Sequence, residues 1–163
     1  PPLPPTEAML RKEFADRAEE LRRPPRYSIE HIYFPRDREG EWEEVVSSIH
    51  TQKLDARAAR SLSSPFLPGY EFRRQTPDQL ARHFGASFVR NLQQAEPQAQ
   101  QWVGPIRSTY GLHYVWISAV EDAREAEFEE VHLQLQRNLE SKARADALRL
   151  AVELLREHYE VRM

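Results

Sequence analysis

The stretch WVGPIRSTYGLHYVWI, residues 102–117, constrains the fold more than any other part of the chain. Two runs rich in β-branched and aromatic residues flank a short segment of serine, threonine and glycine, which is typical of two strands joined by a tight turn. A plain strand needs neither the Gly-Pro pair before the turn nor the histidine after it. We therefore expect a hairpin whose turn presents Ser108 and whose second strand carries His113.

Helical and extended patterns alternate along the rest of the chain. YSIEHIYF alternates and is rich in β-formers, which predicts a strand from Tyr27, and SSPFLPGYEF predicts a loop with a short strand. Apolar residues at helical spacing predict helices over residues 6–22, 42–62 with a break near residue 53, 76–91 and 124–158. This order indicates an α+β fold with an antiparallel sheet at its centre.

The last of these helices is too long for a small domain. At about 1.5 Å per residue it would extend roughly 50 Å. We expect it either to break or to project and pack against the N-terminal helix, through Leu10, Phe14 and Leu21 against the stripe of residues 128–139.

Composition excludes several classes of function. The formal net charge of -3 gives no basis for nucleic-acid binding, and the absence of cysteine excludes disulfides, thiolate metal sites and a cysteine nucleophile. No stretch approaches the roughly 20 apolar residues that span a bilayer, so we expect no membrane contact by this segment. The chain opens with PPLPPTEAML, without a methionine. This predicts a proline-rich linker and a processed or trimmed product that has lost any targeting signal or anchor.

Two parts of the chain together resemble the parvulin, or PpiC-type, peptidyl-prolyl isomerases. That family opens its domain with a strand bearing a histidine, like IEHIYF, and closes it with a strand of the kind seen in GPIRSTYGLH. The resemblance covers roughly residues 27–120 and implies a parvulin-like antiparallel sheet with surrounding helices. It divides the chain into an N-terminal linker and helix (1–26), a parvulin-like domain (27–120) and a C-terminal helical extension (121–163).

The resemblance also implies a set of catalytic residues. His31 and His113 correspond to the family's two central histidines, and Ser108 corresponds to its hydroxyl residue at the turn. We expect the histidines to lie on adjacent central strands and to hydrogen-bond each other, with an organising role rather than one in acid–base chemistry.

Four further residues are implied to bind substrate. Phe84 and Leu80 correspond to the apolar wall of the proline pocket, and Phe88 is either a second wall or ordinary core. Ser64, or its neighbour Ser63, falls where the family usually has a cysteine or an aspartate. SSPFLPGYEF also stands where the family usually has a Gly-Asp-Leu-Gly strand. A neutral hydroxyl cannot supply the field of a carboxylate or thiolate, so we expect turnover roughly a hundredfold below that of a complete parvulin.

The implied reaction requires neither a cofactor nor a metal. Prolyl isomerisation breaks no covalent bond; its barrier of about 18–20 kcal/mol comes from amide resonance. A site that binds the twisted amide better than either planar isomer accelerates it. A zinc site formed by His31, His113 and His83 is disfavoured, because no third ligand stands at a motif spacing.

The resemblance implies that the partners are unfolded or extended, proline-containing polypeptides. It also implies that the protein acts in the bacterial cell envelope or periplasm, with membrane tethering through a missing N-terminal segment as a further option. Two other functions stay open. One is a chaperone or peptide-binding module with weak or no catalysis. The other is an assembly protein in which the terminal helices pair two chains as a homodimer.

Overall fold

The computed structural model describes residues 3–162, so the first two prolines of the predicted linker lie outside the described residues. The chain forms two compact units. Residues 24–123 make up one unit, and the residues before and after them make up the other. In chain order the elements are α1 (Glu7–Asp16), β1 (Arg26–Pro35), η1 (Arg36–Glu41), α2 (Trp42–Thr51), α3 (Ala56–Ala59), η2 (Arg60–Leu62), β2 (Glu71–Gln75), α4 (Pro77–Phe84), α5 (Ala86–Gln94), β3 (Gln101–Arg107), β4 (Gly111–Glu121) and α6 (Phe128–Arg162).

The central unit is built on a four-stranded antiparallel sheet with the order β2-β1-β4-β3. The predicted hairpin is β3 and β4, which pair antiparallel across residues 108–110. Gly111, at the start of β4, has a steric role: a Cβ there would lie 2.2 Å from the carbonyl oxygen of Phe34 on the neighbouring strand. Only glycine lets β1 and β4 approach so closely at this end of the sheet.

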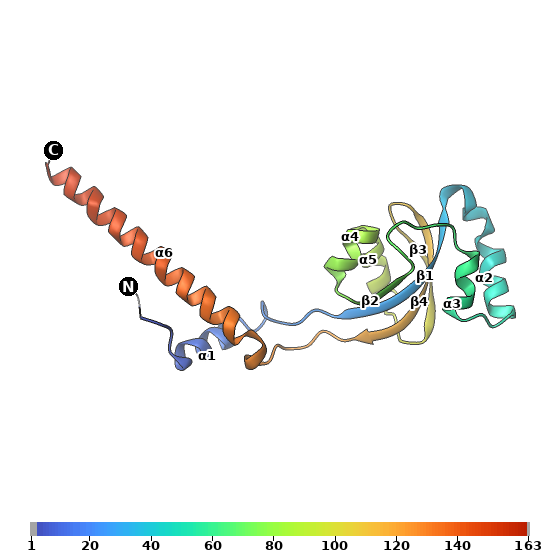
Figure 1. Ribbon diagram of the computed structural model, residues 1–163, viewed down its shortest axis with the longest axis horizontal. Helices are drawn as coiled ribbons and strands as arrows, with labels where there is room; N and C mark the ends of the chain where they lie inside the picture. Colours follow the sequence, from blue (N-terminus) through green and yellow to red (C-terminus); the bar gives the residue numbers. More distant parts are fainter. Residues whose placement is uncertain (1–2, 163) are drawn as a thin grey trace. The chain divides into compact units, whose positions relative to one another are not determined.

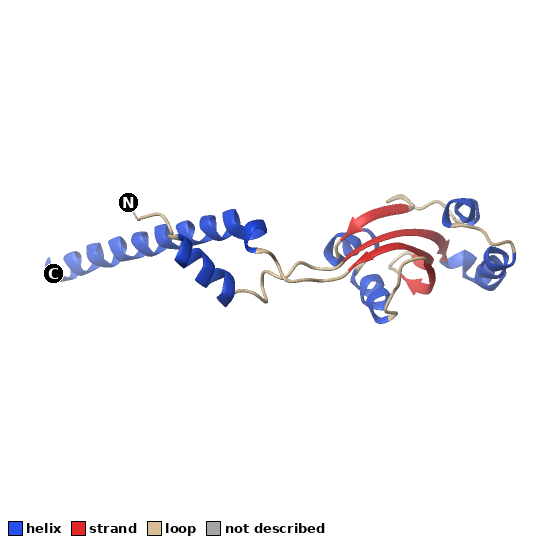
Figure 2. Cartoon of the chain, turned by 90° about the horizontal axis from the view of Figure 1, so that it is seen from below, coloured by secondary structure: helices blue, strands red, loops and turns tan. Residues whose placement is uncertain are grey.

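Helices cover both faces of the sheet (Figures 1 and 2). On one face, α4 and α5 pack their apolar side chains on the strands in a large cluster that includes Ile29, Val115 and Ile117. On the other face, Val45 and Ile49 of α2 pack with the alternate side chains of β1 and β4. Since successive strand residues point to opposite faces, the predicted alternation of YSIEHIYF serves two cores at once.

One predicted helix is divided in the structure. The sequence pattern gave a single helix over residues 76–91, whereas α4 ends at Phe84 and α5 starts at Ala86. Gly85 between them has a φ of 92°, in the region that favours glycine, and a Cβ there would meet the Thr109 side chain at 3.1 Å. The start was predicted correctly: Thr76 caps α4 in a capping box with Gln79.

The terminal segments pair as expected, with different helix ends. Leu10, Leu21, Val131 and Leu135 are buried together, and the rings of Phe14 and Phe128 meet edge to face at 5.6 Å. The first helix stops at Asp16 rather than near residue 22, because the chain then folds into turns that bring Leu21 into this core. The last helix does not break; it runs for 35 residues.

Within the described chain, no helix combines the length and the apolar character needed to cross a bilayer.

Candidate functional site

The two predicted histidines meet on the face of the sheet that α4 and α5 cover. They come from the two central strands, where His113 lies opposite Tyr33 and His31 lies opposite Val115. Both side chains are almost completely buried, and their Nδ1 atoms are 3.0 Å apart. The prediction of a directly hydrogen-bonded pair on adjacent central strands is therefore confirmed.

A hydrogen-bonded chain fixes the tautomer of both rings. His31 Nε2 lies 2.8 Å from the carbonyl oxygen of Gly69, which can only accept, so this nitrogen carries the proton. In a neutral His31 the Nδ1 atom must then accept from the Nδ1–H of His113. That leaves His113 Nε2 as the acceptor for the Ser108 hydroxyl at 2.6 Å, and Ser108 Oγ in turn accepts from the backbone N–H of Tyr110 at 3.1 Å.

Burial keeps both histidines neutral. Desolvation lowers the pKa of His31 to about 4 against the opposing effect of its hydrogen bond to Gly69, and it lowers the pKa of His113 to about 2, with His31 adding to the shift. The neutral state is the one that the chain of bonds requires. Among the side chains that the structure describes, no buried nitrogen or oxygen lacks a hydrogen-bond partner.

The order Ser108, His113, His31 resembles a nucleophile, a base and an orienting group. Two observations argue against nucleophilic chemistry. Ser108 is only 5% exposed, so a substrate carbonyl cannot reach its hydroxyl without rearrangement. With a pKa near 2, His113 is also a poor base at neutral pH. The arrangement is suited to holding β1, β4 and the turn in place.

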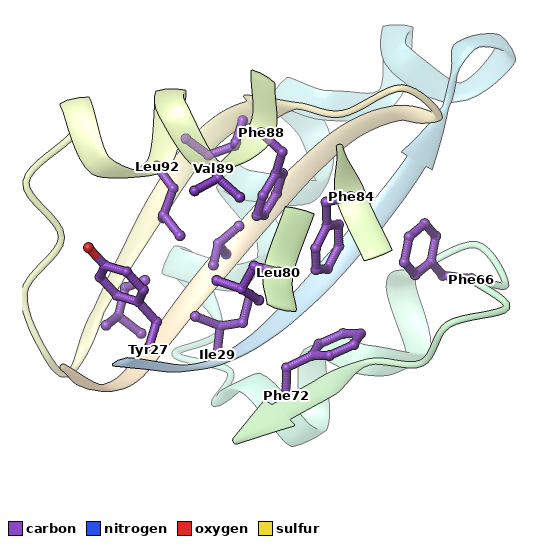
Figure 3. Close-up of a cluster of buried hydrophobic side chains, with 12 residues drawn as sticks. Tyr27, Ile29, Phe66, Phe72, Leu80, Phe84, Phe88, Val89 and Leu92 are labelled. Carbon is purple, nitrogen blue, oxygen red and sulfur yellow. The ribbon is translucent and has the colours of Figure 1, made fainter. Parts of the chain in front are cut away.

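Phe84 and Phe88 pack against the histidine pair, and Leu80 lies in the same buried cluster. Phe84 and Phe88 stack on each other at 4.1 Å, and both rings stand edge-on to the His113 ring at 5.1 and 5.3 Å. Leu80 and Phe84 come from α4 and Phe88 from α5, and all three are fully buried (Figure 3). The structure therefore brings together six of the seven predicted site residues: His31, His113, Ser108, Leu80, Phe84 and Phe88.

The seventh residue is engaged elsewhere. Ser64 Oγ accepts a hydrogen bond of 2.6 Å from the Arg38 guanidinium, and the Ser64 backbone N–H donates to the carbonyl of Tyr33. The neighbouring Ser63 Oγ accepts from the backbone N–H of Tyr33 and donates to the Ser64 carbonyl. Both hydroxyls thus tie their loop to β1 and η1 rather than to the histidine pair.

Sequence reasoning missed two aromatic residues of the site. Phe66 contacts both histidine rings, Tyr33 stacks on His113 at 5.2 Å, and the Tyr33 hydroxyl donates to the carbonyl of Tyr110 at 2.9 Å. Strand alternation could have identified Tyr33, which is two residues from His31 and so on the same face. Phe66 lies in a loop without periodicity, and only its apolar character between two prolines marked it.

No metal centre is evident in the described part of the chain. There, no three histidine, aspartate or glutamate side chains are grouped closely enough to hold an ion. The first two members of the suggested zinc set hydrogen-bond each other, while the His83 ring packs on Phe72.

Comparison with known proteins bears on the fold and the family. A solved structure from work on two SurA-like chaperones of Campylobacter jejuni, the virulence factor PEB4 and the periplasmic protein Cj1289, has a similar fold at 13% sequence identity and a TM-score of 0.55. The alignment covers 93% of this chain but only 61% of that one. No protein with a curated description matches the sequence. Residues 5–132 match the family of PPIC-type PPIASE domains, and the chain therefore belongs to this family of peptidyl-prolyl isomerases.

Proposed function

We propose that this chain accelerates the cis–trans isomerisation of Xaa-Pro bonds in extended client polypeptides. The observation that carries the proposal is the position of Phe84 and Phe88 on the neutral His31–His113 pair, with Ser108 at its end. Six residues predicted from the family pattern converge there, although they come from α4, α5, β1, β4 and the turn before β4.

The surroundings favour catalysis by desolvation. A proline ring held against aromatic side chains loses the water around its peptide bond. Because the planar amide is more polar than the twisted amide, this loss of water costs the planar form more free energy and lowers the barrier. Catalysis by desolvation requires no ionised side chain, and both histidines are neutral at physiological pH. Since Ser63 and Ser64 carry no charge and their oxygens are bound to Tyr33 and Arg38, we expect turnover well below that of a parvulin with a carboxylate or thiolate there.

The proposed clients are unfolded or extended proline-containing chains in the bacterial periplasm. The structural similarity to SurA-like chaperones, one of them named as periplasmic, supports this setting. Because the match spans less than two thirds of that neighbour, this assignment concerns the region compared and extends to no further domains.

Exchange NMR on blocked Ala-Pro peptides tests the activity. We compare the intact chain with Phe84→Leu and with Phe34→Leu, since both phenylalanines are fully buried but Phe34 lies in the cluster on the opposite face of the sheet. Phe84→Leu is expected to lower the exchange rate at least about tenfold, and Phe34→Leu to leave it within twofold as long as the protein stays folded. Equal rates for the two variants, or no acceleration at high protein concentration, would contradict the proposal.

Ser63 and Ser64 accept hydrogen bonds from Tyr33 and Arg38 and are not directed at the histidine pair. This favours a second candidate function, a peptide-binding chaperone without turnover. Suppression of the aggregation of a proline-free client, in the absence of any exchange on Ala-Pro peptides, would select it. Binding restricted to proline-containing chains would count against it.

A further inference from the structure

The loop between η2 and β2 has one side chain that points inward. Phe66 is 6% exposed, whereas the following Leu67 is fully exposed and the flanking Pro65 and Pro68 are exposed too. Both ends of the loop are tied down, by Ser63 and Ser64 at one end and by Gly69 and Tyr70, which bond His31, at the other. The tip of the loop, residues 65–68, has fewer bonds: the backbone N–H of Phe66 donates to the Tyr70 hydroxyl, and the Phe66 carbonyl accepts from the Gly69 N–H. Most of the loop's apolar burial therefore comes from one ring.

That ring contacts the centre of the candidate site. Its centroid is 4.9 Å from His31, 5.4 Å from His113 and 4.9 Å from Tyr33. It also stacks on Phe84 at 5.4 Å with an interplanar angle of 10°, which Figure 3 shows as two facing rings. Phe66 thus lies against both histidines and the main pocket wall at the same time.

The site is closed while Phe66 is in this position. Leu80, Phe84 and Phe88 have no exposed surface, and the two histidines are at most 1% exposed. A substrate ring can contact these residues only after another side chain has left. Most of the partners of Phe66 are fixed in strands or in α4, whereas Phe66 itself lies at the tip of a loop, three residues before Gly69, where φ is 113°.

We propose that Phe66 is the lid of the isomerase pocket: its ring occupies the place of the substrate's apolar ring and swings out when an Xaa-Pro segment enters. This inference rests on the proposed function, and it adds a step that controls the entry of substrate to the same site. The ligand that replaces Phe66 must present an apolar ring of its own, proline or aromatic, because the vacated space is lined by aromatic rings and neutral imidazoles.

Only molecules with the lid open can bind peptide, so the apparent affinity is the intrinsic affinity multiplied by the fraction of open molecules. Burial of a phenylalanine side chain corresponds to a roughly ten- to hundredfold preference for the closed form. Removing the ring should therefore strengthen peptide binding, which is the reverse of what the loss of a pocket wall would do.

The first experiment measures binding of the blocked peptide Ala-Ala-Pro-Ala by NMR titration. Phe66→Ala is expected to bind at least about tenfold more tightly than the intact chain. The matched control is Leu67→Ala, in the same loop but fully exposed, which is expected to stay within twofold. Weaker or unchanged binding by Phe66→Ala would overturn the lid.

The second experiment follows the lid in the intact chain. The protein is labelled with fluorophenylalanine, and the Phe66 signal is assigned by its loss in Phe66→Leu. Adding the peptide should shift this signal to the position of a solvent-exposed ring. A bound peptide with an unmoved Phe66 signal would reject the lid and leave the isomerase proposal intact. Absence of peptide binding by both the intact chain and Phe66→Ala would reject the two together.

Discussion

Each face of the sheet has a histidine that shares a short hydrogen bond with a hydroxyl group. On the α4/α5 face, His113 Nε2 lies 2.6 Å from Ser108 Oγ. On the α2/α3 face, His50 Nε2 lies 2.6 Å from the Tyr114 hydroxyl oxygen. The two bonds have the same length, yet His113 is fully buried and His50 is exposed.

The difference shows that burial, not distance, decides what such a bond contributes. If His50 loses its partner, water can replace the hydroxyl at once. His113 has no such replacement, and both of its ring nitrogens are already used, one by Ser108 and one by His31. A buried polar group left without a partner costs about 1–3 kcal/mol, so the inner network should be far more sensitive to substitution.

The largest expected effect comes from removing the inner imidazole. His113→Ala leaves His31 Nδ1 without a donor and the Ser108 O–H without an acceptor, and it opens a cavity under Phe84 and Phe88, so we expect a loss of about 3–5 kcal/mol in the free energy of unfolding. His50→Ala on the outer face should cost about 1 kcal/mol or less. Urea denaturation of both variants measures the contrast, and similar losses would show that burial is not the deciding factor.

The second largest effect is expected from a change of pH, which acts on the buried histidine pair. In the unfolded chain His31 and His113 take up protons near pH 6.5, whereas the pKa values in the folded chain are about 4 and about 2. The unfolded state therefore binds more protons below pH 6.5, and stability falls as the pH drops from 6.5 towards 4. Between pH 7 and 5 we expect a loss on the order of 2–4 kcal/mol.

Denaturation curves over this pH range, repeated on His31→Gln, test that assignment. The variant should lose about one proton from the pH dependence of unfolding. An unchanged pH dependence would show that His31 is not one of the sensitive groups.

The smallest effect concerns the hydroxyl partners. Ser108→Ala deprives His113 Nε2 and the Tyr110 N–H of their partner, with an expected cost of about 1–2 kcal/mol. Tyr114→Phe removes only a bond to an exposed histidine and should cost about 0.5–1 kcal/mol. Thermal unfolding at pH 7 compares the two, and a larger effect for Tyr114→Phe would reverse the ranking.

Much of the scaffold followed from local sequence signals. Strand alternation, the Thr76 cap and the serine-threonine-glycine turn each have a local physical cause, and the structure has the elements that they predict. The break at Gly85 was missed because the apolar periodicity continues through it. The local signal was the glycine itself, which ends α4 with a φ of 92°.

The site residues inferred from the family resemblance come together where they lie on regular elements. His31, His113, Leu80, Phe84 and Phe88 are on strands or helices, whose geometry fixes the face that each side chain occupies. The loop residues behaved differently: Ser64 bonds Arg38, and Phe66 turns inward, because tertiary contacts rather than periodicity decide where a loop side chain points.

The length of α6 has a consequence for amide exchange with solvent. The core shared with α1 extends along this 35-residue helix as far as Leu139, while Leu148, Leu150, Leu154 and Leu155 beyond it are more than half exposed. A helix without tertiary packing is only marginally stable in water. Deuterium uptake along α6 should therefore be slowest around Val131 and Leu135 and should accelerate turn by turn beyond Leu139. One continuous helix would then open in graded steps rather than as a single unit.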